Sequence, residues 1–211
     1  MNITIIGAGN MARGIGSRFV EGGNAVTIVD TDQPKAQALA AELSARKKGS
    51  ATVASLEVAL ANPVVVLALP FAAARDFAAT NAVKLAGKIV VDITNPLNAT
   101  YDGLVTHPGK SAAEEIAALL PKSRVVKAFN TTFAGTLVEG AVSGHKLDVL
   151  IAGDDAPAKK TIVDLVEAGG LRAIDAGDLH RARQLEGLGL LGITLQGTLG
   201  TGFQSAWKLV A

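Results

Sequence analysis

The first thirty residues combine an apolar run, a glycine-rich turn and an amphipathic segment. Residues 2–6 are mostly β-branched, and Gly7-Ala8-Gly9-Asn10-Met11-Ala12 follows them directly. Gly7 permits a sharp turn at the end of a strand, Gly9 lets the main chain approach a ligand, and Ala12 lets the next helix pack closely. The free N–H groups of a helix N-terminus attract phosphate groups. The turn therefore predicts a dinucleotide pyrophosphate site at Gly7, Gly9, Asn10, Met11 and Ala12. A glycine turn of another doubly wound fold remains the alternative.

A second apolar run, residues 25–29, ends at Asp30, about 20 residues after Gly7. A carboxylate at this position accepts hydrogen bonds from the two ribose hydroxyl groups of NAD. A 2′-phosphate there would be repelled by about 4 kcal/mol per charge pair, at ~4 Å and an effective dielectric constant of ~20. The next residues, Thr31 and Asp32, provide no positive charge. Asp30 therefore favours NAD over NADP, unless it only caps the following turn.

Composition excludes several other functions for this chain of 211 residues. Cysteine is absent, which excludes disulfides, thiolate zinc sites and thiol nucleophiles. The net charge of +1 gives no indication of a nucleic-acid or membrane-surface partner. The three histidines stand apart from one another, so we predict no metal site. With no signal peptide and no apolar run long enough to span a bilayer, we expect a cytoplasmic protein that acts on a small molecule.

Short apolar runs alternate with amphipathic segments along most of the chain. This alternation indicates βαβ units, because parallel strands need a crossover segment between them. We expect a doubly wound parallel α/β sheet of the Rossmann type over residues 1–178, with a C-terminal helical appendage over residues 179–211. The expected strands are 2–6, 25–29, 51–53, 64–68, 89–92, 124–129, 148–152 and 172–175, and the main helices are 11–20, 33–46, 71–85, 112–120 and 156–168.

The expected appendage has leucines at mostly helical spacing, but also six glycines between residues 187 and 202. Each interior glycine costs a helix about 1 kcal/mol relative to alanine, so packing must stabilise a helix here. We expect this segment to close one side of the cofactor cleft and to contact a second subunit in a homodimer. An ordinary capping helix of the same domain is the alternative.

Two loops are expected at the carboxyl ends of central strands, where ligands bind in open α/β sheets. The first contains Leu69 and Pro70, which would form an apolar wall beside the dinucleotide. The second contains Asn95 and Pro96, and the Asn95 amide would hydrogen-bond to the nicotinamide ribose or carboxamide. Each loop also has a simpler interpretation as a turn.

A third loop, residues 128–133, brings neutral hydrogen-bonding groups to the same edge of the sheet. Asn130 and Thr131 suit the positioning of a substrate or a nicotinamide ring, and we assign them as the catalytic residues on that basis. Strong acid–base chemistry would need a different group, for which Lys127 is a candidate.

The chain resembles the NADP-dependent reductases of the 8-hydroxy-5-deazaflavin coenzyme and the related oxidoreductase domain of the membrane metalloreductases. The likeness runs nearly from end to end. Its motifs are Gly7-Ala8-Gly9-Asn10-Met11, Leu69-Pro70, Ser111-Ala112-Ala113-Glu114, Val125-Val126-Lys127-Ala128-Phe129-Asn130-Thr131, Ala152-Gly153-Asp154-Asp155, Leu171-Arg172 and Asp175-Ala176-Gly177. The chain differs from those reductases at Asp30-Thr31-Asp32, where they carry Ser-Arg-Arg, and at Asn130, where the archaeal enzymes carry a histidine.

The resemblance implies a nicotinamide-dependent oxidoreductase that transfers a hydride between NAD(P)H and a flavin or deazaflavin acceptor. Such a transfer depends on proximity and orientation, which agrees with the neutral groups predicted at the site. The cofactor stays open between NADP, which the resemblance implies, and NAD, which Asp30 favours. Two other functions remain open: reduction of a small carbonyl or imine, and dinucleotide sensing without catalysis.

Overall fold

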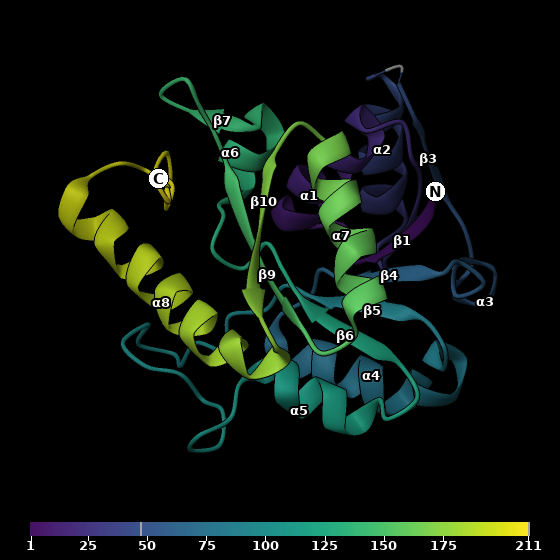
Figure 1. Cartoon of the computed structure of the whole chain (residues 1–211). Coiled ribbons are helices and arrows are strands. Elements are labelled where there is room, and N and C mark those ends of the chain that lie inside the picture. Colours follow the sequence, from purple (N-terminus) through teal and green to yellow (C-terminus); the bar gives the residue numbers. More distant parts are fainter. Residues whose placement is uncertain (47, 211) are drawn as a thin grey trace.

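The computed structural model describes residues 1–46 and 48–210 and contains an eight-stranded sheet with helices on both faces (Figure 1). The strand order is β10-β9-β6-β5-β4-β1-β2-β3. The six strands from β3 to β6 are parallel and follow the order of dinucleotide-binding sheets. Their bounds are β1 (Asn2–Ile6), β2 (Ala25–Val29), β3 (Ser50–Val53), β4 (Val64–Leu67), β5 (Ile89–Asp92) and β6 (Arg124–Lys127). The prediction of a doubly wound α/β sheet is therefore confirmed.

Helices cover the two faces of the sheet and give the molecule two hydrophobic cores. One face carries α1 (Asn10–Glu21), α2 (Gln33–Ser44) and α7 (Ala156–Ala168), and the other carries α4 (Phe71–Leu85) and α5 (Ala112–Leu119) (Figure 1). Every residue of β4 and β5 is buried because both faces are covered. This double coverage explains the continuous apolar runs of the central strands.

The expected strands and main helices are all present, with ends shifted by at most two residues except in the C-terminal segment. The sequence did not predict several short elements. These are α3 (Leu56–Ala59), α6 (Ala134–Glu139), the hairpin of β7 (Ala141–Val142) and β8 (His145–Lys146), and the 3₁₀ turn η1 (Leu179–Arg181). Short elements make few periodic contacts, so their sequence patterns are weak.

The last two strands of the sheet run opposite to the rest, which the expectation of a wholly parallel sheet did not include. β9 (Asp148–Gly153) pairs antiparallel with β6, and β10 (Arg172–Gly177) is parallel to β9. The connection between β6 and β9 consists of loop residues, α6 and the hairpin of β7 and β8. β9 therefore starts beyond the end of β6 and runs back beside it, with Lys127 opposite Ala152 and Val126 opposite Gly153.

The expected C-terminal helix is present, but it ends at Leu199 and the tail that follows it is not helical. Helix α8 (Ala182–Leu199) ends at Gly200, which has a left-handed φ of +62°. The following tail returns to β9, where the Leu209 N–H donates to the Asp148 carboxylate at 2.9 Å and Lys208 pairs with the same carboxylate. Of the expected appendage, residue 211 lies outside the described residues.

Candidate active site

The glycine turn lies at the carboxyl end of β1, beside the end of β4. Gly7 has φ +104°, and a Cβ there would lie 2.4 Å from the Ala68 carbonyl oxygen. At Gly9, a Cβ would have no neighbour within 4 Å, so the backbone faces open space. No side chain caps the N-terminus of α1, which leaves its first N–H groups available to a phosphate. These features fit a dinucleotide pyrophosphate, while Ala12 is fully buried and supports the turn by packing.

An outer cavity of about 650 Å³ adjoins this turn and extends between the end of β2 and helix α4. Gly7, Asp30 and Leu69, three of the predicted site residues, line it. The Asp30 carboxylate accepts the Ala8 N–H at 2.6 Å and the Asp32 N–H at 2.9 Å. Asp30 is therefore fixed directly to the glycine turn, at the place where the adenosine ribose of a dinucleotide would lie.

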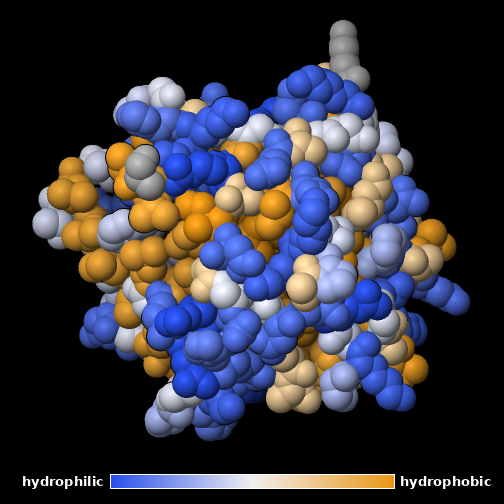
Figure 2. Space-filling view, viewed as in Figure 1, coloured by the Kyte–Doolittle hydropathy of each residue, from blue (hydrophilic) through white to orange (hydrophobic). Residues whose placement is uncertain are grey.

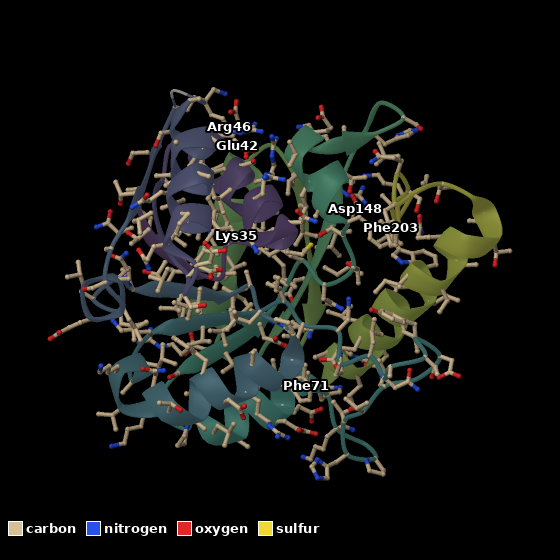
Figure 3. All side chains as sticks on the ribbon, turned by 180° about the vertical axis from the view of Figure 1, so that it is seen from behind. Lys35, Glu42, Arg46, Phe71, Asp148 and Phe203 are labelled. Carbon is tan, nitrogen blue, oxygen red and sulfur yellow. The ribbon has the colours of Figure 1, made fainter. Side chains whose placement is uncertain are left out.

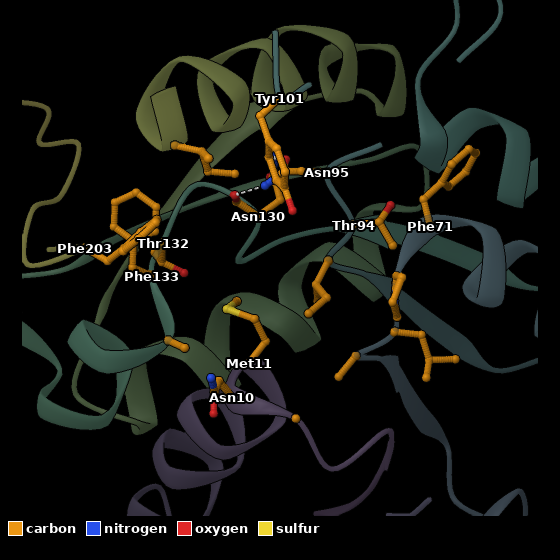
Figure 4. Close-up of a pocket in the computed structure, with 17 residues that line it drawn as sticks. Asn10, Met11, Phe71, Thr94, Asn95, Tyr101, Asn130, Thr132, Phe133 and Phe203 are labelled. Carbon is orange, nitrogen blue, oxygen red and sulfur yellow. Dashed lines mark hydrogen bonds between the residues drawn. The ribbon is translucent and has the colours of Figure 1, made fainter. Parts of the chain in front are cut away.

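Figure 4 shows the residues around an inner cavity of about 480 Å³. Leu69 lines both this cavity and the outer one. It brings together side chains from the ends of β1, β4, β5 and β6, as expected for parallel strands that end at one edge. The predicted residues in its lining are Gly9, Asn10, Met11, Leu69, Pro70, Asn95 and Asn130.

Three predicted site residues, Ala12, Thr131 and Pro96, do not line either cavity. Phe129 has a left-handed φ of +64°, which turns the chain after β6 and brings Thr132, rather than Thr131, to the inner cavity. Pro96 is buried, and its carbonyl accepts the Val105 N–H at 2.8 Å. Pro96 therefore organises its own loop instead of contacting the cavity.

Asn95 and Asn130 form a pair of hydrogen-bonded amides at the wall of the inner cavity (Figure 4). The Asn130 side-chain NH₂ donates to Asn95 Oδ1 at 2.9 Å and to the Leu185 carbonyl at 2.8 Å. The Asn95 NH₂ donates to the Asn130 carbonyl at 2.7 Å. Helix α8 packs closely against this pair, since a Cβ on Gly189 would lie 2.3 Å from Asn95 Oδ1. The start of α8 is thus part of the site.

Two buried oxygen atoms of cavity-lining residues lack a hydrogen-bond partner among residues 1–46 and 48–210. They are Oδ1 of Asn130, an acceptor, and Oγ1 of Thr94, which can donate or accept. An unpaired buried polar atom costs about 1–3 kcal/mol, so such atoms in a native structure call for an explanation. A ligand with an amide group carries both a donor and an acceptor, which are the partners that these two atoms can take.

Aromatic side chains concentrate around the inner cavity. Four of the eight aromatic residues in the chain line it: Phe71, Tyr101, Phe133 and Phe203. Phe133 and Phe203 pack edge to face with ring centroids 5.2 Å apart. Sequence reasoning missed these residues and Thr94 and Ile193, although the scarcity of aromatic residues was an available signal. Flat apolar walls of this kind suit a planar ring.

Lys127, the sequence candidate for a proton donor, is fully buried and does not line either cavity. Its ammonium group donates to Asp92 at 2.7 Å, to the Thr94 carbonyl at 2.5 Å and to Glu186 at 2.8 Å. Burial raises the pKa of Glu186, whose carboxylate also accepts the Ala112 N–H at the start of α5. Lys127 therefore joins β5, β6, α5 and α8 structurally and is not placed to exchange protons with a substrate.

A second, exposed contact holds α8 to α5. The Arg183 guanidinium donates to both carboxylate oxygens of Glu114, at 2.8 and 2.6 Å. These hydrogen bonds lower the pKa of Glu114 to about 2. Two ion pairs, one buried and one exposed, thus fix the first turn of α8 beside the inner cavity.

No group of three or more His, Asp or Glu side chains in the described part of the chain is arranged to hold a metal ion. Within the same residues, no helix is long and apolar enough to cross a membrane.

Comparisons with known proteins agree with this geometry. Residues 2–96 match the family model described as NADP oxidoreductase, coenzyme F420-dependent. The chain is 32% identical over 201 residues to the F420-dependent NADP reductase of Methanocaldococcus jannaschii, and covers 89% of each protein. It is also 34% identical over 188 residues to the metalloreductase STEAP3 of Rattus norvegicus. This match covers 89% of this chain but only 36% of the longer STEAP3 protein.

Solved structures show the same relationship. A protein assigned as an F420-dependent NADP reductase from Arthrobacter sp. FB24 has a TM-score of 0.82, with 32% identity and 99% of both chains covered. An imine reductase from Bacillus cereus has a TM-score of 0.61 at 18% identity over 94% of this chain and 60% of that one, which shows a shared fold alone. The family indicated by the sequence motifs is therefore confirmed. The chain belongs to the family of coenzyme F420-dependent NADP oxidoreductases.

Proposed function

We propose that this protein transfers a hydride between a nicotinamide dinucleotide and a deazaflavin-type acceptor, the reaction type named for its relatives. The observation that carries the proposal is the pair of cavities that meet at Leu69. The outer cavity adjoins the glycine turn and Asp30, and the inner cavity has aromatic walls. The two together match a dinucleotide whose nicotinamide end lies beside a planar second ring.

The residues of the inner cavity would act by positioning. A dihydronicotinamide supplies a hydride from C4 when it is bound. Asn130 Oδ1 and Thr94 Oγ1 would bind the carboxamide edge, and the Asn95–Asn130 amide pair would keep that edge fixed. No acid, lysine, arginine or histidine lines this cavity among the residues that the structure describes. Proximity and orientation alone can lower a barrier by about 7–11 kcal/mol, which makes a neutral site sufficient for direct hydride transfer.

The test is the oxidation of NADH and of NADPH in the presence of different acceptors: a deazaflavin, flavins, ferric chelates and small carbonyls. The reaction is monitored through the loss of absorbance of the reduced nicotinamide. We expect the deazaflavin to be reduced fastest. Asn130→Ala should lower kcat by about 100-fold through misplacement of the ring. The same change at Asn2, which is exposed at the start of β1 and lies outside both cavities, should leave kcat unchanged. Tight dinucleotide binding without turnover of any acceptor would contradict the proposal and favour a sensor.

A second candidate is the reduction of a small carbonyl or imine, which Tyr101 favours. Such a reaction needs a proton donor near the nicotinamide, and Tyr101 carries a phenolic hydroxyl in the lining of the inner cavity (Figure 4). If this candidate is correct, Tyr101→Phe should abolish turnover of carbonyls. Direct hydride transfer to a deazaflavin should survive the same change.

We further propose that the protein forms a homodimer through α8 and acts in the cytoplasm, where reduced dinucleotides are available. Between Glu186 and Lys208 the chain has no charged side chain, yet Leu191, Leu199 and Phe203 are about half exposed or more. Figure 2 shows the resulting hydrophobic area over α8 and the tail, where α8 extends away from the sheet. An uncharged apolar helix surface suits contact with the same surface of a second copy, since no like charges would meet.

A further inference from the structure

The outer cavity contains negative charge and no positive charge. Asp30 lies at the end of β2, and Asp76 faces the same cavity from α4. The other polar groups of the lining are neutral. Among the residues that the structure describes, no lysine, arginine or histidine lines this cavity. The end of the dinucleotide that binds here would therefore meet two carboxylates.

Asp30 is held in one position by its neighbours. The Ala8 N–H donates to Oδ2 at 2.6 Å, and the Asp32 N–H donates to Oδ1 at 2.9 Å. A carboxylate has about four acceptor sites, so both oxygens can still accept ribose hydroxyl groups. A 2′-phosphate has no proton to donate at neutral pH in its doubly charged form, and it would face a carboxylate that cannot rotate away without losing these bonds.

Positive side chains on the surrounding helices do not line the cavity, and one of them, Arg75 of α4, lies over the Phe71 ring at 5.9 Å. Lys35 is exposed in the first turn of α2, and it does not line the cavity. Arg13 of α1 forms an ion pair with Glu42 at 2.9 Å. Figure 3 shows Glu42 and Arg46 toward the end of α2 remote from Lys35. None of these cations lines the cavity that contains Asp30 and Asp76.

We infer that this protein selects NAD(H) over NADP(H), with Asp30 as the main specificity residue and Asp76 as a second one. The inference rests on the proposed function, because it concerns the dinucleotide of that reaction. It sets this chain apart from relatives named for NADP. Asp30 would select by accepting the ribose hydroxyl groups, whereas Asp76, which is exposed, would act through its charge alone and more weakly.

The experiment is a fluorescence titration of the full chain with NADH and with NADPH, in the absence of any acceptor. We expect NADH to bind at least tenfold more tightly. Asp30→Ser combined with Thr31→Arg should reverse the preference, and Asp76→Asn should reduce it two- to fivefold. Because Asp76 is exposed on a helix surface, this second variant is expected to fold normally. At low salt, the effect of Asp76→Asn on the preference for NADH should be larger, because the charge of the Asp76 carboxylate is screened less.

Two control variants separate the site from general charge effects. Asp164→Asn removes the same charge from an exposed position on α7, and it should leave the ratio of the two dissociation constants unchanged. Lys35→Met should also leave the ratio unchanged. A selective loss of NADPH binding in Lys35→Met would show that Lys35 contacts the 2′-phosphate, and would overturn the inference.

Equal binding of the two dinucleotides, or tighter binding of NADPH, would overturn the inference while the proposed hydride transfer could still be observed. Tight and selective NADH binding without hydride transfer to any acceptor would support the inference and contradict the proposed function. If neither dinucleotide bound, both would be overturned.

Discussion

At the scale of single residues, Gly7 and Gly9 serve different purposes although they share one turn. Gly7 is required by the fold, because its φ is left-handed and a Cβ would collide with the Ala68 carbonyl. Gly9 is free of such contacts, so a side chain there would project into the space left for a phosphate. The sequence motif identifies both glycines but does not tell these two roles apart.

The two roles predict different outcomes for two small substitutions. Gly9→Val should weaken dinucleotide binding by tenfold or more and leave the melting temperature nearly unchanged. Gly7→Ala should lower the stability of the whole domain by about 1–3 kcal/mol, as is typical of strained backbone positions. Calorimetry and a dinucleotide titration on both variants measure this difference. If the Gly9→Val variant bound the dinucleotide normally, the result would show that the pyrophosphate does not bind at Gly9.

Lys127 shows where reasoning about single residues fails. A lysine between a strand and a polar loop resembles a catalytic group in sequence. In the fold, the same side chain is fully buried and paired with Asp92 and Glu186, which lie 35 and 59 residues away. These partners come from other elements, so no local pattern could have revealed them.

At the scale of elements, α8 contributes Ile193 to the inner cavity and packs on the Asn95–Asn130 amide pair, although its sequence is poor for a helix. Gly189 lies against Asn95 and leaves no room for a Cβ, whereas Gly187, two residues earlier, has no neighbour within 4 Å. The glycines of this helix are therefore not equivalent. One permits close packing on the amide pair, and the other only weakens the helix.

This difference gives a matched pair of variants on one helix. Gly187→Ala should stabilise the protein by about 1 kcal/mol, the difference in helix propensity between the two residues. Gly189→Ala should displace α8 from Asn95, destabilise the protein and lower kcat. Chemical denaturation and steady-state kinetics on the two variants provide the measurement. Equal effects of the two substitutions would mean that α8 does not pack on the amide pair in solution.

At the scale of the whole molecule, the proposed dimer depends on the exposed apolar residues of α8. Leu191→Asp with Leu199→Asp should convert the proposed dimer to a monomer, because charges would meet across the two-fold contact. Light scattering measures the mass, and Val83→Asp is a suitable control because Val83 is 91% exposed on α4. A native protein that is monomeric at all concentrations would contradict the proposed dimer.

The sequence alone determined the sheet, its helices, the glycine turn and most of the loops that reach the carboxyl edge. These features depend on local periodicity and on turn chemistry, which act over a few residues. The sequence did not indicate that β9 runs opposite to β6, or that α8 ends at Gly200. It also did not indicate the left-handed turn at Phe129, after which Thr132 and not Thr131 lines the inner cavity.

Only the tertiary structure decided which side chains meet. It brought Tyr101, Phe133 and Phe203 around one cavity, and it placed Asp76 in the same cavity as Asp30. It also buried Lys127 between two carboxylates. The physical reason is that such contacts join residues from separate crossovers of the sheet. Their positions follow from how whole helices pack on that sheet, and no short stretch of sequence encodes them.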